Sequence, residues 1–225
     1  TRSAFVTGVQ TCALPISRVR AVVGVDPEPD MLAQARRAAG DRGNVSWVLG
    51  SDADVPALGL ALGTLGAVTI GQALHWMDHA RLFGELAPLI RPGGGIAVVA
   101  NGIPLWLQDT SWSRALRGCV EGWLGHPLVN ACGTDEASQR RYRAALAAAG
   151  FTVREVAVDY TDGLDVEQVT GGVYSALPVD RLPSAAQRPV LDEEIRRALE
   201  PHLPLREDVH VAIMLGRRVL AGQVP

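Results

Sequence analysis

The sequence contains no lysine, and all 21 of its basic residues are arginine. They stand against 24 acidic residues, so that the formal net charge is −3. This balance excludes a general electrostatic attraction to nucleic acid or to an anionic membrane, and we expect neither as a partner. The lack of lysine, together with abundant alanine, valine and glycine, indicates a GC-rich bacterial coding sequence.

Cysteine is also scarce. The three cysteines, Cys12, Cys119 and Cys132, form no C-x-x-C pair, so we expect neither a metal site nor a redox motif. No apolar run is long enough to span a bilayer, and the first residues lack the basic start and continuous apolar stretch of a secretory signal. We therefore expect a cytoplasmic protein with reduced cysteines.

One short stretch near the start looks foreign to the rest. Residues 6–16 read VTGVQTCALPI, which matches the conceptual translation of a common sequencing adaptor over eleven consecutive residues. We therefore expect residues 1–16 to be a non-native segment and natural sequence to begin near Ser17. The alternative is a genuine strand over residues 4–9, followed by a turn.

The remaining chain alternates short apolar runs with helical patterns. Apolar, β-branched runs predict strands, here over residues 21–26, 44–49, 67–70, 96–100, 152–158 and 209–215. Apolar residues at helical spacing predict helices, here over residues 29–39, 78–90, 134–149, 166–175 and 185–199. This alternation predicts one α/β domain over residues 17–225, with a mainly parallel sheet and helices on both faces.

Residues 101–133 depart from this pattern. Trp106, Trp112 and Trp123 fall here, with glycine and proline between them. We expect a helical insertion or lid. Its aromatic side chains either line an apolar acceptor pocket or pack the lid itself.

Polar residues follow the ends of three expected strands, where open α/β sheets bind ligands. Asp26 ends the first strand, where a carboxylate either accepts hydrogen bonds from a ribose diol or caps the next turn. Asp52 follows the second strand, where it either borders an adenine or is a solvated loop acid. His75 and Trp76 follow the third strand. An imidazole there suits a general base, although a lone histidine is more often structural.

Taken in order, the motifs of the chain resemble class I S-adenosylmethionine (SAM)-dependent methyltransferases of the broad type 11 group. The motifs are VGVDPxxxMLxxA at 23–35, NVxWVxGSDA at 44–53, ALHWMD at 73–78 and LIRPGGG at 89–95. Later segments at 150–153, 169–175 and 209–218 resemble the closing antiparallel hairpin of that fold. The resemblance covers residues 21–219 and depends on the order and spacing of the motifs.

The resemblance implies a Rossmann-like methyltransferase sheet, S-adenosyl-L-methionine as cofactor and a small molecule as acceptor. It places Asp26 at the ribose hydroxyls, with Pro27 and Met31 beside it. The residues expected at the adenine are Ser51, Asp52 and Ala53. Those expected on the methionine side are Gln72, Ala73 and Leu74. The resemblance places His75 and Trp76 facing the adenine, the sulfonium or the acceptor. For methyl transfer, His75 is the candidate catalytic base and Asp78 a weaker candidate partner. The candidates for the substrate pocket are His75, Trp76 and Trp106.

One family motif is absent. The D/E-x-G-x-G-x-G loop should precede Asp26 by about twenty residues, since its glycines let the backbone approach the cofactor. In the family the sheet order is 3-2-1-4-5-7-6, and the central strand leads into that loop. We therefore expect a truncated chain. For such a chain we expect one of two outcomes. Either residues 4–9 fill the central position between strands 21–25 and 67–70, or the sheet is distorted and SAM binds weakly.

Two other functions remain open at this point. A Rossmann-type NAD(P)-dependent oxidoreductase would use Asp26 equally well, although the His-Trp pair, the Arg-Pro-Gly-Gly turn and the terminal hairpin fit it less well. A non-catalytic binding module with the same fold is the other alternative. The sequence leaves the acceptor and the oligomeric state open.

Overall fold

A computed structural model describes residues 19–128, 133–177 and 181–219. The segment expected to be foreign, the alternative strand over residues 4–9, Cys12 and Cys132 lie outside the described residues. Cys119 is a free, half-buried thiol, and burial raises its pKa. Among the described helices, none combines the length and apolar character that a membrane span needs.

The chain divides into two compact units, each with its own apolar core. In the described part of the chain, unit 1 is built from residues 101–134 and 158–211. Unit 2 is built from residues 19–100, 135–157 and 212–219. The predicted insertion 101–133 thus belongs to a larger unit that also includes the segment between the last two strands.

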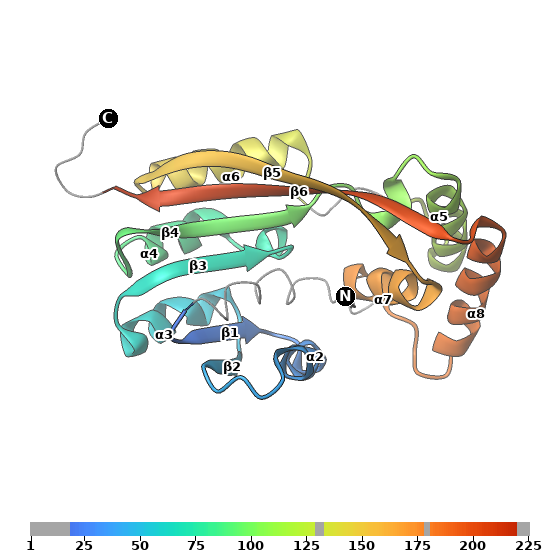
Figure 1. The fold of residues 1–225 in the computed structure, drawn as a ribbon, viewed down its shortest axis with the longest axis horizontal. Coiled ribbons are helices and arrows are strands. Elements are labelled where there is room, and N and C mark those ends of the chain that lie inside the picture. The colour runs from blue at the N-terminus through green and yellow to red at the C-terminus, as the bar shows by residue number, and fades with distance from the viewer. Residues whose placement is uncertain (1–18, 129–132, 178–180, 220–225) are drawn as a thin grey trace. The chain divides into compact units, whose positions relative to one another are not determined.

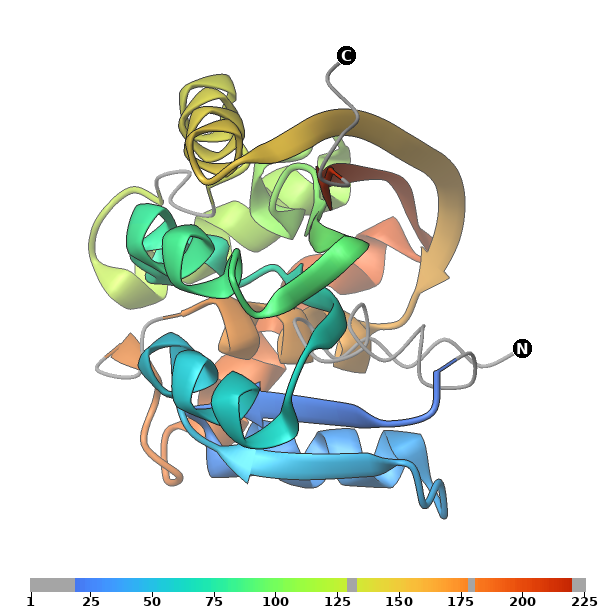
Figure 2. The same ribbon diagram turned by 90° about the vertical axis from the view of Figure 1, so that its left-hand side faces the viewer.

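Unit 2 begins with a parallel β-α-β unit. Its elements are β1 (Val22–Asp26), α2 (Pro29–Ala39) and β2 (Val45–Leu49), at the positions that the sequence predicts. The two strands pair in parallel, from Val22 opposite Val45 to Asp26 opposite Leu49. Helix α2 packs against both strands (Figure 2). The helix starts at a proline and ends at Gly40, whose φ of +60° suits a residue without a Cβ.

The chain then continues through a helix that the sequence analysis missed. The elements are η2 (Asp52–Asp54), α3 (Val55–Leu62), β3 (Leu65–Gly71), η3 (Leu74–Trp76), α4 (His79–Leu86) and β4 (Ile90–Asn101). The sequence of α3, VPALGLAL, has no polar side and hence no amphipathic period to reveal a helix. Helix α4 ends four residues earlier than expected, at Leu86.

The Arg-Pro-Gly-Gly-Gly segment lies inside β4 and not in a separate turn. Leu65 of β3 stands opposite Ile90, whereas Ala67 stands opposite Gly95, so the register shifts at this segment. A Cβ on Gly94 would lie 2.4 Å from the carbonyl oxygen of Gly66, which explains the need for glycine there. The segment is therefore a bulge that carries the chain into the paired part of β4.

The described strands form two sheets, one of order β1-β2 and one of order β3-β4-β6-β5 (Figure 1). The last two strands are β5 (Phe151–Leu164) and β6 (Leu205–Arg218), and they run in opposite directions (Figure 1). Placed side by side, the two sheets give the family order with its central strand left out. Within the described residues, no strand joins β1 to β3.

The core of unit 2 forms between α4, α6 (Glu136–Ala148) and the strands β3 and β4. Its fully buried side chains include Phe83, Leu86, Ile90 and Leu146. The helix expected from residue 134 begins at Glu136, and its N-cap is Asp135, not Thr134, because Asp135 Oδ1 accepts the backbone N–H of Ser138 at 2.9 Å. Both residue types are good caps, and the sequence alone does not separate them.

Unit 1 consists of helices around the outer halves of β5 and β6. The helices are η4 (Leu105–Leu107), α5 (Ser111–Leu124), α7 (Val166–Ala176), α8 (Arg188–Leu199) and η6 (Glu200–His202). Their core side chains include Trp106, Trp112, Leu116, Val169, Val173, Leu191 and Ile195. The helical character predicted for residues 101–133 is thus present in the described part, and α5 packs against α8.

Candidate functional site

Asp26 is the last residue of β1 and is half-buried. Its Oδ1 accepts the backbone N–H of Glu28 at 2.9 Å, so it caps the turn into α2. Its Oδ2 has no hydrogen-bond partner among the described residues. Burial raises the pKa of this carboxyl group, and the bond to Glu28 opposes that shift. One oxygen therefore holds the turn while the other can bind a ligand.

Pro27 and Met31, the other residues expected at the ribose, lie in this turn and in the helix that follows it. Pro27 is exposed and follows Asp26 directly, and Met31 is half-buried in the first turn of α2. Their role at a ribose stays a prediction.

The predicted adenine residues begin η2 directly after β2. Ser51 is its N-cap, since Ser51 Oγ accepts the N–H of Ala53 at 3.3 Å and the Ser51 N–H donates to Asp54 Oδ2 at 2.8 Å. Asp52 forms an ion pair with Arg81 of α4, with 2.6 Å between Oδ2 and the guanidinium, and its side chain is only 19% exposed. The ion pair thus shields much of the Asp52 carboxylate from solvent.

The residues expected on the methionine side follow β3. Gln72 has a φ of +48°, and its backbone N–H donates to the carbonyl of Val99 at 3.0 Å. This left-handed conformation is costly for a residue with a Cβ, and such strain is concentrated at functional sites. Ala73 is half-buried. Leu74 is 3% exposed and packs in the core of unit 2, so only its backbone remains to face a ligand.

His75 and Trp76 form a ring pair at the end of η3. Their centroids are 4.8 Å apart, with the ring planes tilted by 44°. Burial lowers the pKa of His75, which favours the neutral imidazole that a base requires. Trp76 is 67% exposed, which excludes a role in core packing. Asp78 is the N-cap of α4, where its Oδ1 accepts the N–H of Arg81, and within the described residues no hydrogen bond joins it to His75.

Trp106 belongs to unit 1 and is only 4% exposed. Its side chain packs in the core of that unit, and its carbonyl accepts Nε–H of Arg117 at 2.7 Å. Of the two roles considered for the tryptophans, this burial favours lid packing over a pocket wall.

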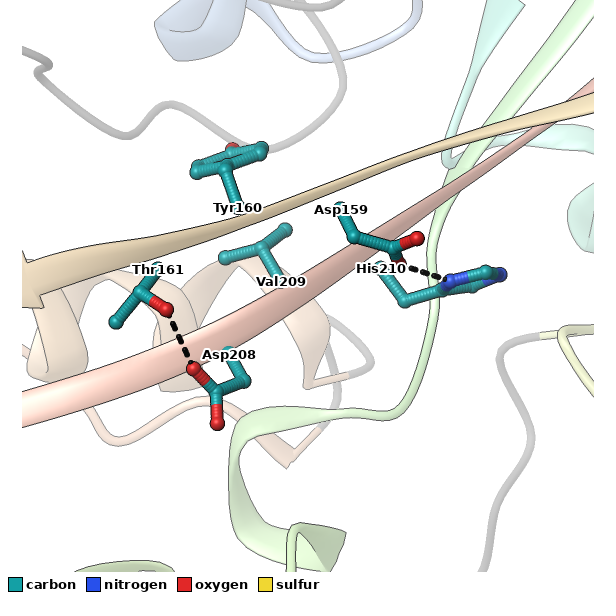
Figure 3. Close-up of a pocket in the computed structure, with 6 residues that line it drawn as sticks. All are labelled: Asp159, Tyr160, Thr161, Asp208, Val209 and His210. Carbon is teal, nitrogen blue, oxygen red and sulfur yellow. Dashed lines mark hydrogen bonds and ion pairs between the residues drawn. The ribbon is translucent and has the colours of Figure 1, made fainter.

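A groove on the β5/β6 strand pair escaped the sequence analysis (Figure 3). It has a volume of about 350 Å³ and is lined by Asp159, Tyr160, Thr161, Asp208, Val209 and His210. Two cross-strand pairs line it. His210 Nδ1 lies 2.5 Å from Asp159 Oδ1, and Thr161 Oγ1 donates to Asp208 Oδ1 at 2.7 Å. Charged residues of this kind resemble any solvent-facing strand, so no pattern in the sequence marks them.

No group of three or more His, Cys, Asp or Glu side chains is placed to hold a metal ion in the described part of the chain. The site at the strand ends thus contains carboxylates, an imidazole and an exposed indole ring. These groups can bind hydroxyl and amine groups and exchange a proton.

Known proteins resemble this chain in sequence. Residues 4–98 match the family described as methyltransferase domain. The chain is 30% identical over 207 residues to the uncharacterized methyltransferase Rv3342 of Mycobacterium tuberculosis, covering 92% of this chain and 75% of that protein. It is 34% identical over 147 residues to the demethylmenaquinone methyltransferase of Thermus thermophilus, covering 59% of this chain and 64% of that protein.

Solved structures share the fold. The YcgJ protein of Bacillus subtilis superposes with a TM-score of 0.51 at 16% identity, covering 94% of this chain and 88% of that one. A protein of Anaeromyxobacter dehalogenans assigned as a type II methyltransferase gives 0.51 at 21% identity, covering 95% and 87%. The fold is thus the Rossmann-like α/β fold of methyltransferases. By sequence, the chain belongs to the class I SAM-dependent methyltransferases. This leaves the oxidoreductase and the non-catalytic module without support.

Proposed function

We propose that this chain binds SAM at the carboxyl ends of β1, β2 and β3 and transfers its methyl group to a small-molecule acceptor. The observation that carries the proposal is Asp26, a half-buried carboxylate at the end of β1 with one oxygen available to a ligand. A ribose diol offers two hydroxyl donors, which a carboxylate binds more strongly than a neutral acceptor does.

The other contacts follow from the local structure. Pro27 and Met31 border the ribose. Ser51, Asp52 and Ala53 border the adenine, where the backbone of η2 faces the ring because Arg81 already binds the carboxylate of Asp52. Gln72, Ala73 and the backbone of Leu74 line the methionine side.

When bound, SAM supplies a methyl group on a positively charged sulfur, which keeps the bonding electron pair as the acceptor's lone pair forms the new bond. The chain needs mainly to hold acceptor and donor in line, and acid–base help is secondary. His75 provides that help. As a neutral imidazole it can take the proton that the acceptor loses. The exposed ring of Trp76 provides a flat apolar surface beside it.

We further propose that SAM binds weakly to the chain as written. The glycine loop of the family is absent from the expected distance before Asp26, and no described strand joins β1 to β3. Both β1 and β3 help to build the proposed site. If no strand fixes β1 relative to β3, the ribose contacts at β1 and the methionine contacts at β3 would be misplaced relative to each other.

Ligand-observed NMR at millimolar SAM, followed by calorimetry, tests the proposal. Asp26→Asn should weaken SAM binding by about 10-fold or more, the worth of a hydrogen bond to a charged group. Asp30→Asn, an exposed change in the first turn of α2, should leave it unchanged. Because burial raises the pKa of Asp26, wild-type affinity should fall as pH is lowered through that pKa, whereas the Asp26→Asn variant should show a smaller fall.

Three results would contradict these statements. Absence of a SAM signal at millimolar concentration, or an equal signal with NAD, contradicts the cofactor assignment. Equal affinity of wild type and Asp26→Asn contradicts the role of Asp26. A micromolar dissociation constant for the wild type contradicts the weak binding alone.

A further inference from the structure

We propose that Arg81 is a positioning residue that joins two halves of the proposed SAM site. The adenine half is the turn after β2, residues 51–54, and the methionine half is the stretch from β3 into α4, residues 72–78. The role toward SAM rests on the proposed function, whereas the link itself is argued from contacts within unit 2. Arg81 acts through Asp52 and not on the ligand itself.

The guanidinium group of Arg81 is held by carboxylates from two elements. Its Nη2 lies 2.6 Å from Oδ2 of Asp52 in η2, and its Nη1 donates to Oε2 of Glu85 at 2.9 Å. Glu85 lies one turn further along α4, so it holds the arginine side chain in a position to reach Asp52. The side chains of Asp52 and Arg81 are 19% and 37% exposed, so solvent screens this pair less than a fully exposed one.

The backbone of Arg81 belongs to the start of the methionine half. Its N–H donates to Oδ1 of Asp78 at 3.2 Å, and Asp78 is the N-cap that begins α4. The residues just before this cap include His75 and Trp76. One residue thus contacts the turn expected at the adenine and the stretch expected at the methionine and the acceptor.

The turn after β2 is also fixed internally, by its second acid. Oδ2 of Asp54 accepts the N–H of Ser51 at 2.8 Å, and Oγ of Ser51 accepts the N–H of Ala53 at 3.3 Å. These bonds form a capping box, which stabilises the turn without help from another element. Loss of Arg81 should therefore leave the adenine half folded and release only its polar attachment to α4.

In the described part of unit 2, the sheet does not join these halves, because β1 pairs only with β2 and β3 belongs to the other sheet. Helix α3 joins them by apolar packing. Its Val55 packs against the core, and a Cβ on Gly59 would lie 2.5 Å from Leu89. Apolar packing has no direction of its own, whereas an ion pair holds two particular groups together. Arg81 therefore sets where the adenine half stands relative to α4.

Two ligands separate this role from a general effect on the turn. SAM must engage both halves at once, so its affinity depends on their spacing. Adenosine lacks the methionine group, and its proposed contacts all lie on β1, α2 and the adenine half. Ligand-observed NMR titrations of the full chain measure both dissociation constants.

Arg81→Gln should weaken SAM binding about threefold, the worth of a partly exposed ion pair, and leave adenosine binding unchanged. Asp52→Asn should do the same, and the double variant should lose no more than either single variant, because all three lack the same pair. Arg140→Gln is the matched control. It removes the same charge from a more exposed ion pair on α6 and should change neither dissociation constant.

Equal losses of SAM and adenosine binding in Arg81→Gln would overturn the proposal, since Arg81 would then only shape the turn. Unchanged or tighter SAM binding would also overturn it, because Arg81 would then compete with the adenine for Asp52.

The absence of a SAM signal from wild type at millimolar concentration would contradict the proposed function, and urea denaturation of the same variants then decides the link. The equilibrium constant of unfolding should rise about threefold in each single variant and no further in the double variant. Additive effects of the two substitutions would show that no such link exists.

Discussion

Gln72 is the one described residue other than glycine with a positive φ, at +48°. A left-handed backbone costs a residue with a Cβ about 1–2 kcal/mol, and it persists where neighbouring contacts impose it. Here Gly71 ends β3 and the N–H of Gln72 is bonded to Val99. The strained residue stands at the proposed methionine end of the SAM site. The strain and the sequence motif thus point to the same position.

Substitutions at Gln72 should reveal this strain. Gln72→Gly should leave the free energy of unfolding unchanged or raise it by up to about 1 kcal/mol, because glycine adopts this φ freely. Gln72→Val should lower it by about 1–3 kcal/mol, since a β-branched side chain tolerates this φ poorly. Urea denaturation measures both.

The exposed helical residue Gln34 of α2 provides the matched control. There glycine should be the worse substitution, because a helix interior penalises glycine more than valine. The same order of stability at both positions would show that Gln72 is not strained.

At the scale of elements, periodic sequence predicted structure well where one side of an element is polar. The helices α2 and α7 follow from such patterns. The strands β1 and β2 follow from apolar, β-branched runs, whereas the order of the strands was expected from the family resemblance. Helix α3 could not be found in this way, because its residues are apolar throughout. The long strands β5 and β6 were predicted too short, since their outer halves carry charged residues.

The residues of the candidate site also differ in how far the sequence alone could indicate them. Asp26 and Asp52 could be proposed because strand ends follow from sequence patterns and open α/β sheets bind ligands there, whereas Ser51 and Gln72 were expected only from the family resemblance. The resemblance made Trp106 a candidate for the substrate pocket, and the burial of its side chain in the core of unit 1 favours packing instead.

The β1–β2 pair should be the least protected part of unit 2. Among the described residues, β1 pairs only with β2, whereas β3 belongs to a four-stranded sheet. A two-stranded pair is marginal in stability without a further strand. Backbone amides of β1 and β2 should therefore exchange with deuterium at least about tenfold faster than those of β3 and β4. Equal protection would show that another segment pairs with β1, as the central strand does in the family.

At the scale of the whole molecule, the chain forms two apolar cores, and the strands β5 and β6 extend from one core to the other. β5 and β6 each begin in one unit and end in the other, while the buried clusters around Ile90 and around Ile195 share no side chain. The residues of the proposed SAM site all belong to unit 2.

The same substitution placed in each core should show this separation. Ile90→Val and Ile195→Val each remove one methylene from a side chain that is 0% exposed, which should cost about 0.5–1.5 kcal/mol. If each unit opens as its own cooperative unit, amide exchange should accelerate mainly in unit 2 for the first variant and in unit 1 for the second. Ile103→Val, at a side chain that is 59% exposed, should change neither. Uniform acceleration across both units by either core variant would mean that β5 and β6 bind the two cores into one cooperative whole.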